Sequence, residues 1–366
     1  MIQHEDHIFA RETMTMHIEK IEIVNFRGLR NAQFNDIKRI NYIVGGNNSG
    51  KTSVLEALVV GGCYSDIDLL LDTILARSQK KFLDGAKNMI IPEGMERSEV
   101  TIRFDEITMC TDISCIDGAS SVQKSDSGLK SKRKITVSFE SEFGKKTEIK
   151  KEKYWINFEE TEKNISYRKD PNFYRKDILK IPCQFISFSR FDRTDKILNY
   201  LDSVFMNNQR EQLLNVLRIF DPEVDNFEVV GEKRQILIIK NNKETKLPLF
   251  LNDYGNGMYK AFYIACAALI AENGILLIDE LEAGIHHKAL EEFVDYLDKI
   301  SVERNIQFLV TTHSLELLDI ARKSHGDALA IYNIKIKKNN NGNTLVKRIG
   351  EKEIQLLRGD LGLDIR

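Results

Sequence analysis

Residues 45–52 carry the pattern with the clearest chemical meaning, Gly-Gly-Asn-Asn-Ser-Gly-Lys-Thr, which fits G-x-x-x-x-G-K-[ST]. A strand-like run at 40–44 precedes it, and apolar residues at helical spacing follow it, which is the context a phosphate-binding loop requires. Glycines let successive N–H groups point at an anion, and the helix adds its positive end. A chance glycine turn is the weaker alternative. The predicted phosphate-binding residues are Gly45, Asn47, Asn48, Ser49, Gly50, Lys51, Thr52 and Ser53.

Two acidic residues follow a second buried strand. The apolar run at 275–278 ends in Asp279 and Glu280, and carboxylates at this end of a parallel strand sit where such sheets bind ligands. We expect Asp279 to join Thr52 in holding Mg²⁺, and Glu280 to polarise a water for attack on a γ-phosphate. Two solvated acids after a strand are common on their own, but the upstream loop favours the functional interpretation.

A third strand, at 307–312, leads into His313. A lone histidine after a strand usually packs or faces solvent. Because this one follows a second buried strand, which comes after Asp279 and Glu280, we expect it to contact the γ-phosphate. The pair His286 and His287 has no further ligand at metal spacing, which favours a surface or subunit contact.

Gly255, Asn256 and Gly257 precede a helix expected at about 259–271. Two glycines at a helix start make a second anion-receptive end. A simple turn entering a helix is the alternative.

The remaining pattern predicts an α/β core with an insertion. Apolar residues alternate with polar ones near 100–104, 135–139 and 154–158, as in half-exposed antiparallel strands. We expect a separate β lobe at 98–170 and a helical subdomain at 190–222 within one domain at 16–366. Residues 1–15 are expected to be a disordered leader.

Composition fits an ordinary globular protein: 366 residues, 42% hydrophobic, net charge −2. Five scattered cysteines and the lack of a signal or membrane-spanning pattern predict a cytoplasmic protein without membrane contact. A basic segment at 119–134 is expected to be a mobile hairpin tip, with a contact to DNA or a partner as the alternative.

These elements, in this order, resemble the ATP-binding-cassette ATPases of the branch that contains RecF, the structural-maintenance-of-chromosomes (SMC) heads and the overcoming-lysogenisation-defect proteins. The resemblance rests on the N-terminal strand and turn at 21–29, the Walker A loop GGNNSGKT, the signature NDYGNGM, the Walker B segment ILLIDELEAGIH and the switch segment TTHS. It implies a P-loop fold that binds ATP with Mg²⁺ and closes head-to-tail as a homodimer or higher homo-oligomer, each ATP lying between Walker A and the partner's signature. The residues that it adds as nucleotide contacts are Arg27, Asn252, Gly255, Asn256 and Gly257.

The chain departs from the family pattern at two places. The signature lacks Leu-Ser-Gly-Gly-Gln, and the best glutamine-loop candidate is Gln184, as a metal ligand, although packing explains that residue equally well.

The leading functional hypothesis is an ATP-hydrolysing switch that controls a separate effector, such as a nuclease, in bacterial anti-phage defence. Too little chain follows His313 for an added nuclease domain. The alternatives are a RecF-like DNA-binding ATPase of repair or recombination, a transporter motor and a non-hydrolysing scaffold.

Overall fold

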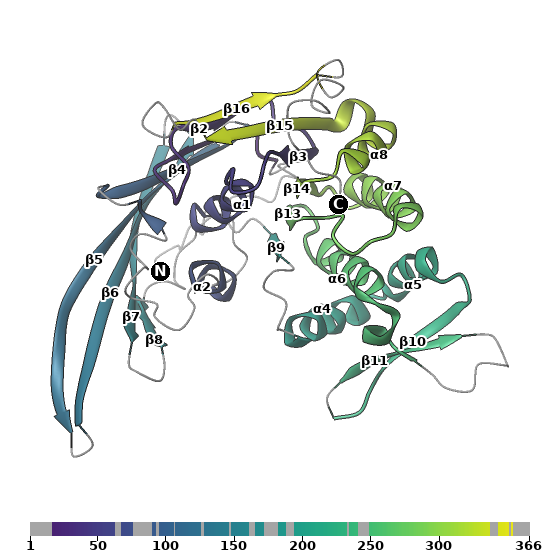
Figure 1. Ribbon diagram of the computed structural model, residues 1–366, viewed down its shortest axis with the longest axis horizontal. Coiled ribbons are helices and arrows are strands. Elements are labelled where there is room, and N and C mark those ends of the chain that lie inside the picture. The colour runs from purple at the N-terminus through teal and green to yellow at the C-terminus, as the bar shows by residue number, and fades with distance from the viewer. Residues whose placement is uncertain are drawn as a thin grey trace, which may run out of the picture.

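A six-stranded sheet runs through the centre of the computed structural model (Figure 1). Its order is β16-β15-β3-β14-β13-β9, and all neighbours are parallel except β16, which is antiparallel to β15. The strands are β3 (Ile40–Val44), β9 (Cys183–Ser187), β13 (Ile275–Asp279), β14 (Gln307–Thr312), β15 (Leu329–Ile336) and β16 (Thr344–Arg348). The central strands β3, β13 and β14 are buried along their whole length, as the apolar run at 275–278 predicted for β13.

The structure describes residues 17–62, 67–75, 90–92, 95–105, 107–125, 128–145, 148–160, 165–171, 182–187, 194–232, 234–240, 249–336, 343–350 and 353. The expected leader at 1–15 lies outside these ranges. Within them, no helix combines the length and the apolar composition needed to cross a membrane.

Helices pack on one face of the central sheet. They are α4 (Thr194–Met206), α5 (Arg210–Phe220), α6 (Asn256–Ile270), α7 (His287–Glu303) and α8 (Leu315–His325). Because side chains alternate along a strand, Leu276 and Ile278 of β13 face this helical layer, whereas Ile275 and Leu277 face the other side. The expected helical subdomain at 190–222 contains two helices, α4 and α5, with Asn208 (φ 56°) in the break between them.

On the opposite face, α1 (Lys51–Val60) and α2 (Ile67–Leu75) lie between the central sheet and a second sheet (Figure 1). The second sheet has the order β2-β1-β4-β5-β6-β7-β8. Its strands are β1 (Lys20–Val24), β2 (Ala32–Phe34), β4 (Arg97–Phe104), β5 (Ile107–Ser125), β6 (Gly128–Lys145), β7 (Glu148–Glu160) and β8 (Ile165–Lys169). The helix that follows the phosphate loop is thus enclosed between two sheets, which explains why both its faces are buried.

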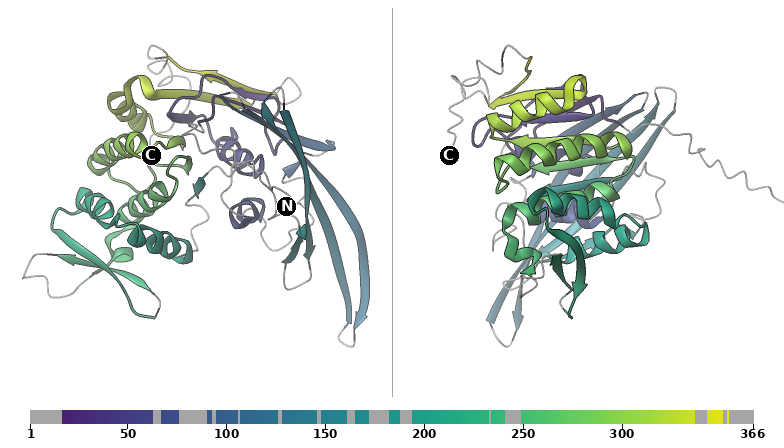
Figure 2. Two further views of the ribbon diagram at one scale, coloured as in Figure 1. Left: turned by 180° about the vertical axis from the view of Figure 1, so that it is seen from behind. Right: turned by 90° about the vertical axis from the view of Figure 1, so that its right-hand side faces the viewer.

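The strands expected to form a separate β lobe share their sheet with the N-terminal strands. Strand β4 pairs antiparallel with β1 along its length, so the lobe widens an existing sheet. Sequence reasoning did not indicate this shared sheet, because strand pairing between 20–24 and 99–103 leaves no mark in local sequence. The β5–β6 hairpin projects far from the body (Figure 2). The division of the chain into domains stays a prediction.

A small antiparallel sheet lies beside α4 and α5 (Figure 1). It contains β10 (Val224–Val230), β11 (Gln235–Lys240) and β12 (Leu249–Phe250), and the short helix η3 (Leu251–Tyr254) connects it to α6. A second short helix, η4 (Gly326–Ala328), joins α8 to β15. The sheet therefore leads the chain directly to the glycines that precede α6.

Candidate functional site

The glycine-rich loop joins the carboxyl end of β3 to the start of α1. Gly50, the N-cap residue of α1, has φ 94°, a left-handed conformation that favours glycine, and a Cβ there would lie 2.6 Å from Leu29. Gly45 is equally restricted, because a Cβ would lie 2.5 Å from the carbonyl oxygen of Ile334. No side chain caps α1, so its first N–H groups are available to an anion.

Lys51 folds back over this loop. Its ammonium donates to the carbonyl oxygens of Gly45 (2.9 Å) and Gly46 (3.0 Å). Burial lowers the pKa of Lys51 to about 8, although nearby carboxylates, Asp279 foremost, act in the opposite direction. The loop thus holds a cation directly beside the N-terminus of α1, an arrangement that suits a polyphosphate.

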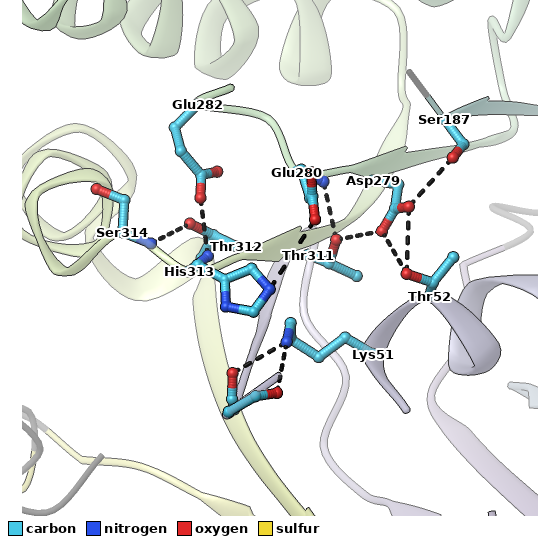
Figure 3. A network of polar contacts seen from close by, with 12 residues as sticks. Lys51, Thr52, Ser187, Asp279, Glu280, Glu282, Thr311, Thr312, His313 and Ser314 are labelled. Carbon is cyan, nitrogen blue, oxygen red and sulfur yellow. Dashed lines mark hydrogen bonds and ion pairs between the residues drawn. The ribbon is translucent and has the colours of Figure 1, made fainter. Parts of the chain in front are cut away.

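Asp279 is the centre of a hydroxyl cluster (Figure 3). Its carboxylate accepts hydrogen bonds from Thr52 Oγ1 (3.0 and 3.2 Å), Ser187 Oγ (3.1 Å) and Thr311 Oγ1 (2.6 Å). Oxygen donors of this kind, with one carboxylate, fit Mg²⁺, which keeps several waters and otherwise binds substrate phosphates. Thr52 and Asp279 are the residues that would hold the ion.

Glu280 has an unusual backbone conformation, with φ 54°. Its N–H donates to Thr311 Oγ1 (2.9 Å), and its carbonyl oxygen accepts from the Lys260 ammonium. The Glu280 carboxylate is half exposed and lies 4.0 Å from His313 Nε2. The peptide of Glu280 is therefore held from both sides while its carboxylate stays accessible to water.

His313 lies at the carboxyl end of β14, and its backbone N–H donates to Glu282 Oε1 (2.8 Å). Burial first, and then the Lys51 cation, lower the pKa of His313. The ring is consequently neutral at pH 7 and can donate a hydrogen bond from one nitrogen. Lys51, Asp279, Glu280 and His313 thus come together, as the sequence predicted, at one edge of the central sheet (Figure 3).

The signature residues lie at the start of α6, on the helical face of the sheet. Gly255 and Asn256 are exposed, as is Asn252 on η3. Gly257 lies against the segment after Glu280, since a Cβ on it would lie 2.4 Å from the Gly284 carbonyl oxygen. The described contact of Gly257, which was predicted to bind nucleotide, is thus with Gly284 and Ile285 of its own chain.

Gln184 was predicted as a metal ligand, and the structure does not support that role. Its carboxamide oxygen accepts a hydrogen bond from Tyr200 (2.6 Å), and its register partner is Leu276. Asp279 instead pairs with Ser187, three residues further along β9 and so about 10 Å away. Two other residues considered with it, Ser189 and Arg190, lie outside the described residues.

Arg27 was predicted to contact the nucleotide, and its guanidinium instead forms a buried ion pair with Glu56 of α1. It also donates to the Thr73 carbonyl oxygen of α2 (3.2 Å). The resemblance indicated the turn correctly, but the partner of Arg27 follows from how α1 and α2 pack against that turn.

Of the four basic residues at 130–134, the structure describes one side chain. The side chains of Lys130, Lys132 and Arg133 lie outside the described residues, and Lys134 pairs with Glu159 (3.1 Å). The backbone forms the outer half of the β5–β6 hairpin.

Sequence reasoning assigned no role to Thr311, Glu282 or Lys260, and it named Ser187 only as a neighbour of the glutamine-loop candidate Gln184. All four contact the predicted residues Asp279, Glu280 or His313 through side-chain atoms. Thr311 belongs to the switch segment itself, and its two-residue spacing from His313 was the one available signal.

The fold and the site define a P-loop ATPase, and family comparison agrees. Residues 125–319 match the family described as "AAA domain, putative AbiEii toxin, Type IV TA system", and residues 16–185 match "AAA ATPase domain". The first match spans more than half of the 366 residues, so the chain belongs to that AAA family. The protein is an ATPase.

Two individual relatives share between 25% and 35% of aligned residues with this chain. The chain is 25% identical over 326 residues, 83% of its length and 87% of the relative's, to an "ATP/GTP phosphatase" of Helicobacter pylori. It is 35% identical over 113 residues to an uncharacterised protein of Methanocaldococcus jannaschii, which covers 31% of this chain and 98% of the relative.

Among solved structures, it is similar to an SMC head bound to the C-terminal winged-helix domain of ScpA (TM-score 0.48, 15% identity, 93% of this chain and 99% of that one). It is also similar to the SMC head of Thermotoga maritima (TM-score 0.41, 15% identity, 92% and 100%). These structural similarities are too distant to bear on function.

Proposed function

We propose that this ATPase is a molecular switch in which two chains close head-to-tail over two ATP molecules and, through hydrolysis, control a separate effector. The convergence of Lys51, Asp279, Glu280 and His313 at one sheet edge carries the hydrolytic part of the proposal (Figure 3). The relative named "ATP/GTP phosphatase" is consistent with it.

Each residue has a role that follows from its position. Lys51 leaves the carbonyl oxygens of Gly45 and Gly46 and binds the outer phosphates, which replace those acceptors with a full negative charge. Thr52 and Asp279 would hold a Mg²⁺ ion, which would neutralise charge on the phosphate oxygens. Glu280 accepts the proton of the attacking water, and the His313 ring donates a hydrogen bond to the γ-phosphate.

The position of α6 supports a dimer. Helices α1 and α6 cover opposite faces of the central sheet (Figure 1), and Gly257 at the start of α6 lies against the segment after Glu280. Gly255 and Asn256 are exposed at a helix N-terminus, where a second chain's phosphates would find free N–H groups. A head-to-tail pair would bring this end to the partner's ATP.

Size measurement with a hydrolysis-deficient variant tests the dimer. Glu280→Gln removes the proton acceptor but keeps the shape, so it should bind ATP and accumulate as a dimer with Mg²⁺. Lys51→Ala is the matched control, and it should stay monomeric because it lacks the phosphate-binding cation. If Glu280→Gln binds ATP and yet remains monomeric by light scattering at saturating nucleotide, the head-to-tail switch is wrong.

The family description names a toxin and a toxin–antitoxin system, which supports a role beside a second protein in bacterial defence. Affinity capture of tagged Glu280→Gln from the native cell should retain that partner, and Lys51→Ala should not. Capture of DNA alone, with an affinity that falls steeply with salt, would replace the effector by a nucleic acid.

A further inference from the structure

Thr311 makes more contacts with the Walker B segment than any role assigned so far explains. It is fully buried on β14, and its hydroxyl donates to Asp279 Oδ1 (2.6 Å) while accepting from the Glu280 N–H (2.9 Å). Its carbonyl oxygen also accepts from the Leu281 N–H (3.3 Å). One residue of the switch strand thus holds the last residue of β13 and the two residues that follow it.

The regular pairing of β13 with β14 ends just before these contacts. The last parallel pair is Ile278 with Val310, and beyond it the chain turns out of the sheet. The Glu280 N–H therefore needs an acceptor other than the strand ladder, and the Thr311 hydroxyl supplies it. A hydroxyl has a single hydrogen, so donation to Asp279 leaves its lone pairs free for this N–H.

Glu280 adopts a conformation that a glutamate does not favour. Its φ of 54° is left-handed, and such conformations persist only where surrounding contacts over-determine them. Here the Thr311 hydroxyl binds the N–H side, and the Lys260 ammonium binds the carbonyl side. The direction in which the Glu280 side chain leaves the backbone depends on these contacts.

We propose that Thr311 is a positioning residue of the hydrolytic centre. Its hydroxyl aims Asp279 at the ion and sets the backbone turn that presents Glu280 to the attacking water. The inference rests on the proposed roles of Asp279 and Glu280 in hydrolysis. Because the hydrogen bonds of this hydroxyl go to Asp279 and to the Glu280 N–H, its loss should reduce turnover and leave ATP affinity nearly unchanged.

A simpler role has to be separated from this one. Thr311 could stabilise the fold merely by satisfying a buried N–H, and any substitution that destabilises the site would then lower activity. Thr312 is the matched control, because it is the next residue on β14, is equally buried, and its hydroxyl accepts from the Ser314 N–H (2.9 Å) without contacting Asp279 or Glu280.

The experiment compares Thr311→Val, Thr311→Ser and Thr312→Val, with kcat from phosphate release and Kd from a fluorescent ATP analogue. Valine keeps the shape and removes the hydroxyl, so Thr311→Val should lower kcat about 100-fold, as expected for a misplacement of about 1 Å, with Kd within about threefold. Serine keeps the hydroxyl, so Thr311→Ser should stay within about fivefold of the parent protein. Thr312→Val should have the same melting temperature as Thr311→Val, but its kcat should stay close to that of the parent protein.

Two outcomes overturn the inference while leaving ATP hydrolysis at this site intact. One is a Thr311→Val kcat within about threefold of the parent protein while Glu280→Gln is inactive. The other is a Thr311→Ser variant as slow as Thr311→Val, which would assign the effect to packing of the methyl group, and this arm decides even if Thr311→Val fails to fold. A Glu280→Gln variant that hydrolyses ATP normally would instead refute the proposed role of Glu280.

Discussion

The Thr52 hydroxyl lies 3.0 Å from a carboxylate oxygen of Asp279, although 227 positions separate the two residues in the chain. Thr52 lies in the first turn of α1, and Asp279 ends β13, two strands away from the strand that leads into α1. The contact is possible because β3, β14 and β13 are parallel, which places their carboxyl ends at one edge. This edge is where the expected ion and phosphates would bind.

Nucleotide affinity should depend on pH through Lys51. The pKa of its ammonium is lowered to about 8, so the cation is lost as the pH rises through 8 in the nucleotide-free protein. Bound phosphates favour the charged form, so binding should take up a proton and Kd should rise by up to about tenfold per pH unit above 8. Titration with a fluorescent nucleotide at several pH values measures this.

The control for the pH effect is Lys51→Arg, which stays charged throughout the range. Its Kd should be flat with pH, whatever its absolute value. A parent protein with constant Kd from pH 7 to pH 9.5 would show that Lys51 does not release its proton in this range.

Ser187 and Gln184 should respond differently to mutation. Ser187→Ala removes a donor to Asp279, so the Mg²⁺ concentration for half-maximal hydrolysis should change by several-fold. Gln184→Leu removes a hydrogen bond with Tyr200 at a position three residues from Ser187, so its Mg²⁺ dependence should match that of the parent protein while the free energy of unfolding falls by about 1 kcal/mol. A large Mg²⁺ effect confined to Gln184→Leu would restore the ligand role first predicted for it.

Arg27 should matter for stability rather than for nucleotide binding. Arg27→Met leaves the Glu56 carboxylate, which is fully buried, without its cation, and removal of one partner of a buried pair lowers the free energy of unfolding by about 3–5 kcal/mol. The double variant Arg27→Met with Glu56→Leu should recover most of this loss. Urea unfolding measures both variants. A folded Arg27→Met that loses ATP affinity at unchanged stability contradicts the structural role.

Alanine substitutions at Gly255 and Gly257 should have different effects on ATP hydrolysis, although Gly255 is the N-cap residue of α6 and Gly257 lies in its first turn. A Cβ on Gly257 would lie 2.4 Å from the backbone carbonyl of Gly284, so Gly257→Ala must push α6 away from the segment after Glu280. A Cβ on Gly255 would have no atom within 4 Å, so Gly255→Ala would strain only the backbone, which has φ 94° there. We expect a greater loss of ATP hydrolysis from Gly257→Ala than from Gly255→Ala. Equal effects would mean that contact with Gly284 is unimportant.

Much of the site was predictable because its residues belong to short sequence motifs. The phosphate loop, the buried run before Asp279 and the strand before His313 are each local patterns, and the structure places them on β3–α1, β13 and β14. Register was less accessible. Gln184 and Ser187 lie on the same predicted strand, and only pairing with β13 decides that Ser187 is opposite Asp279.

By itself the sequence determined the class of this protein and the residues at the end of each parallel strand, since glycine loops and apolar runs act through local backbone geometry. Only the tertiary structure decided which side chains meet. The pairing of β4 with β1, the ion pair of Arg27 with Glu56 and the contacts of Thr311 with Asp279 and Glu280 join segments far apart in the chain. Such contacts depend on packing and strand register, which no short stretch of residues encodes.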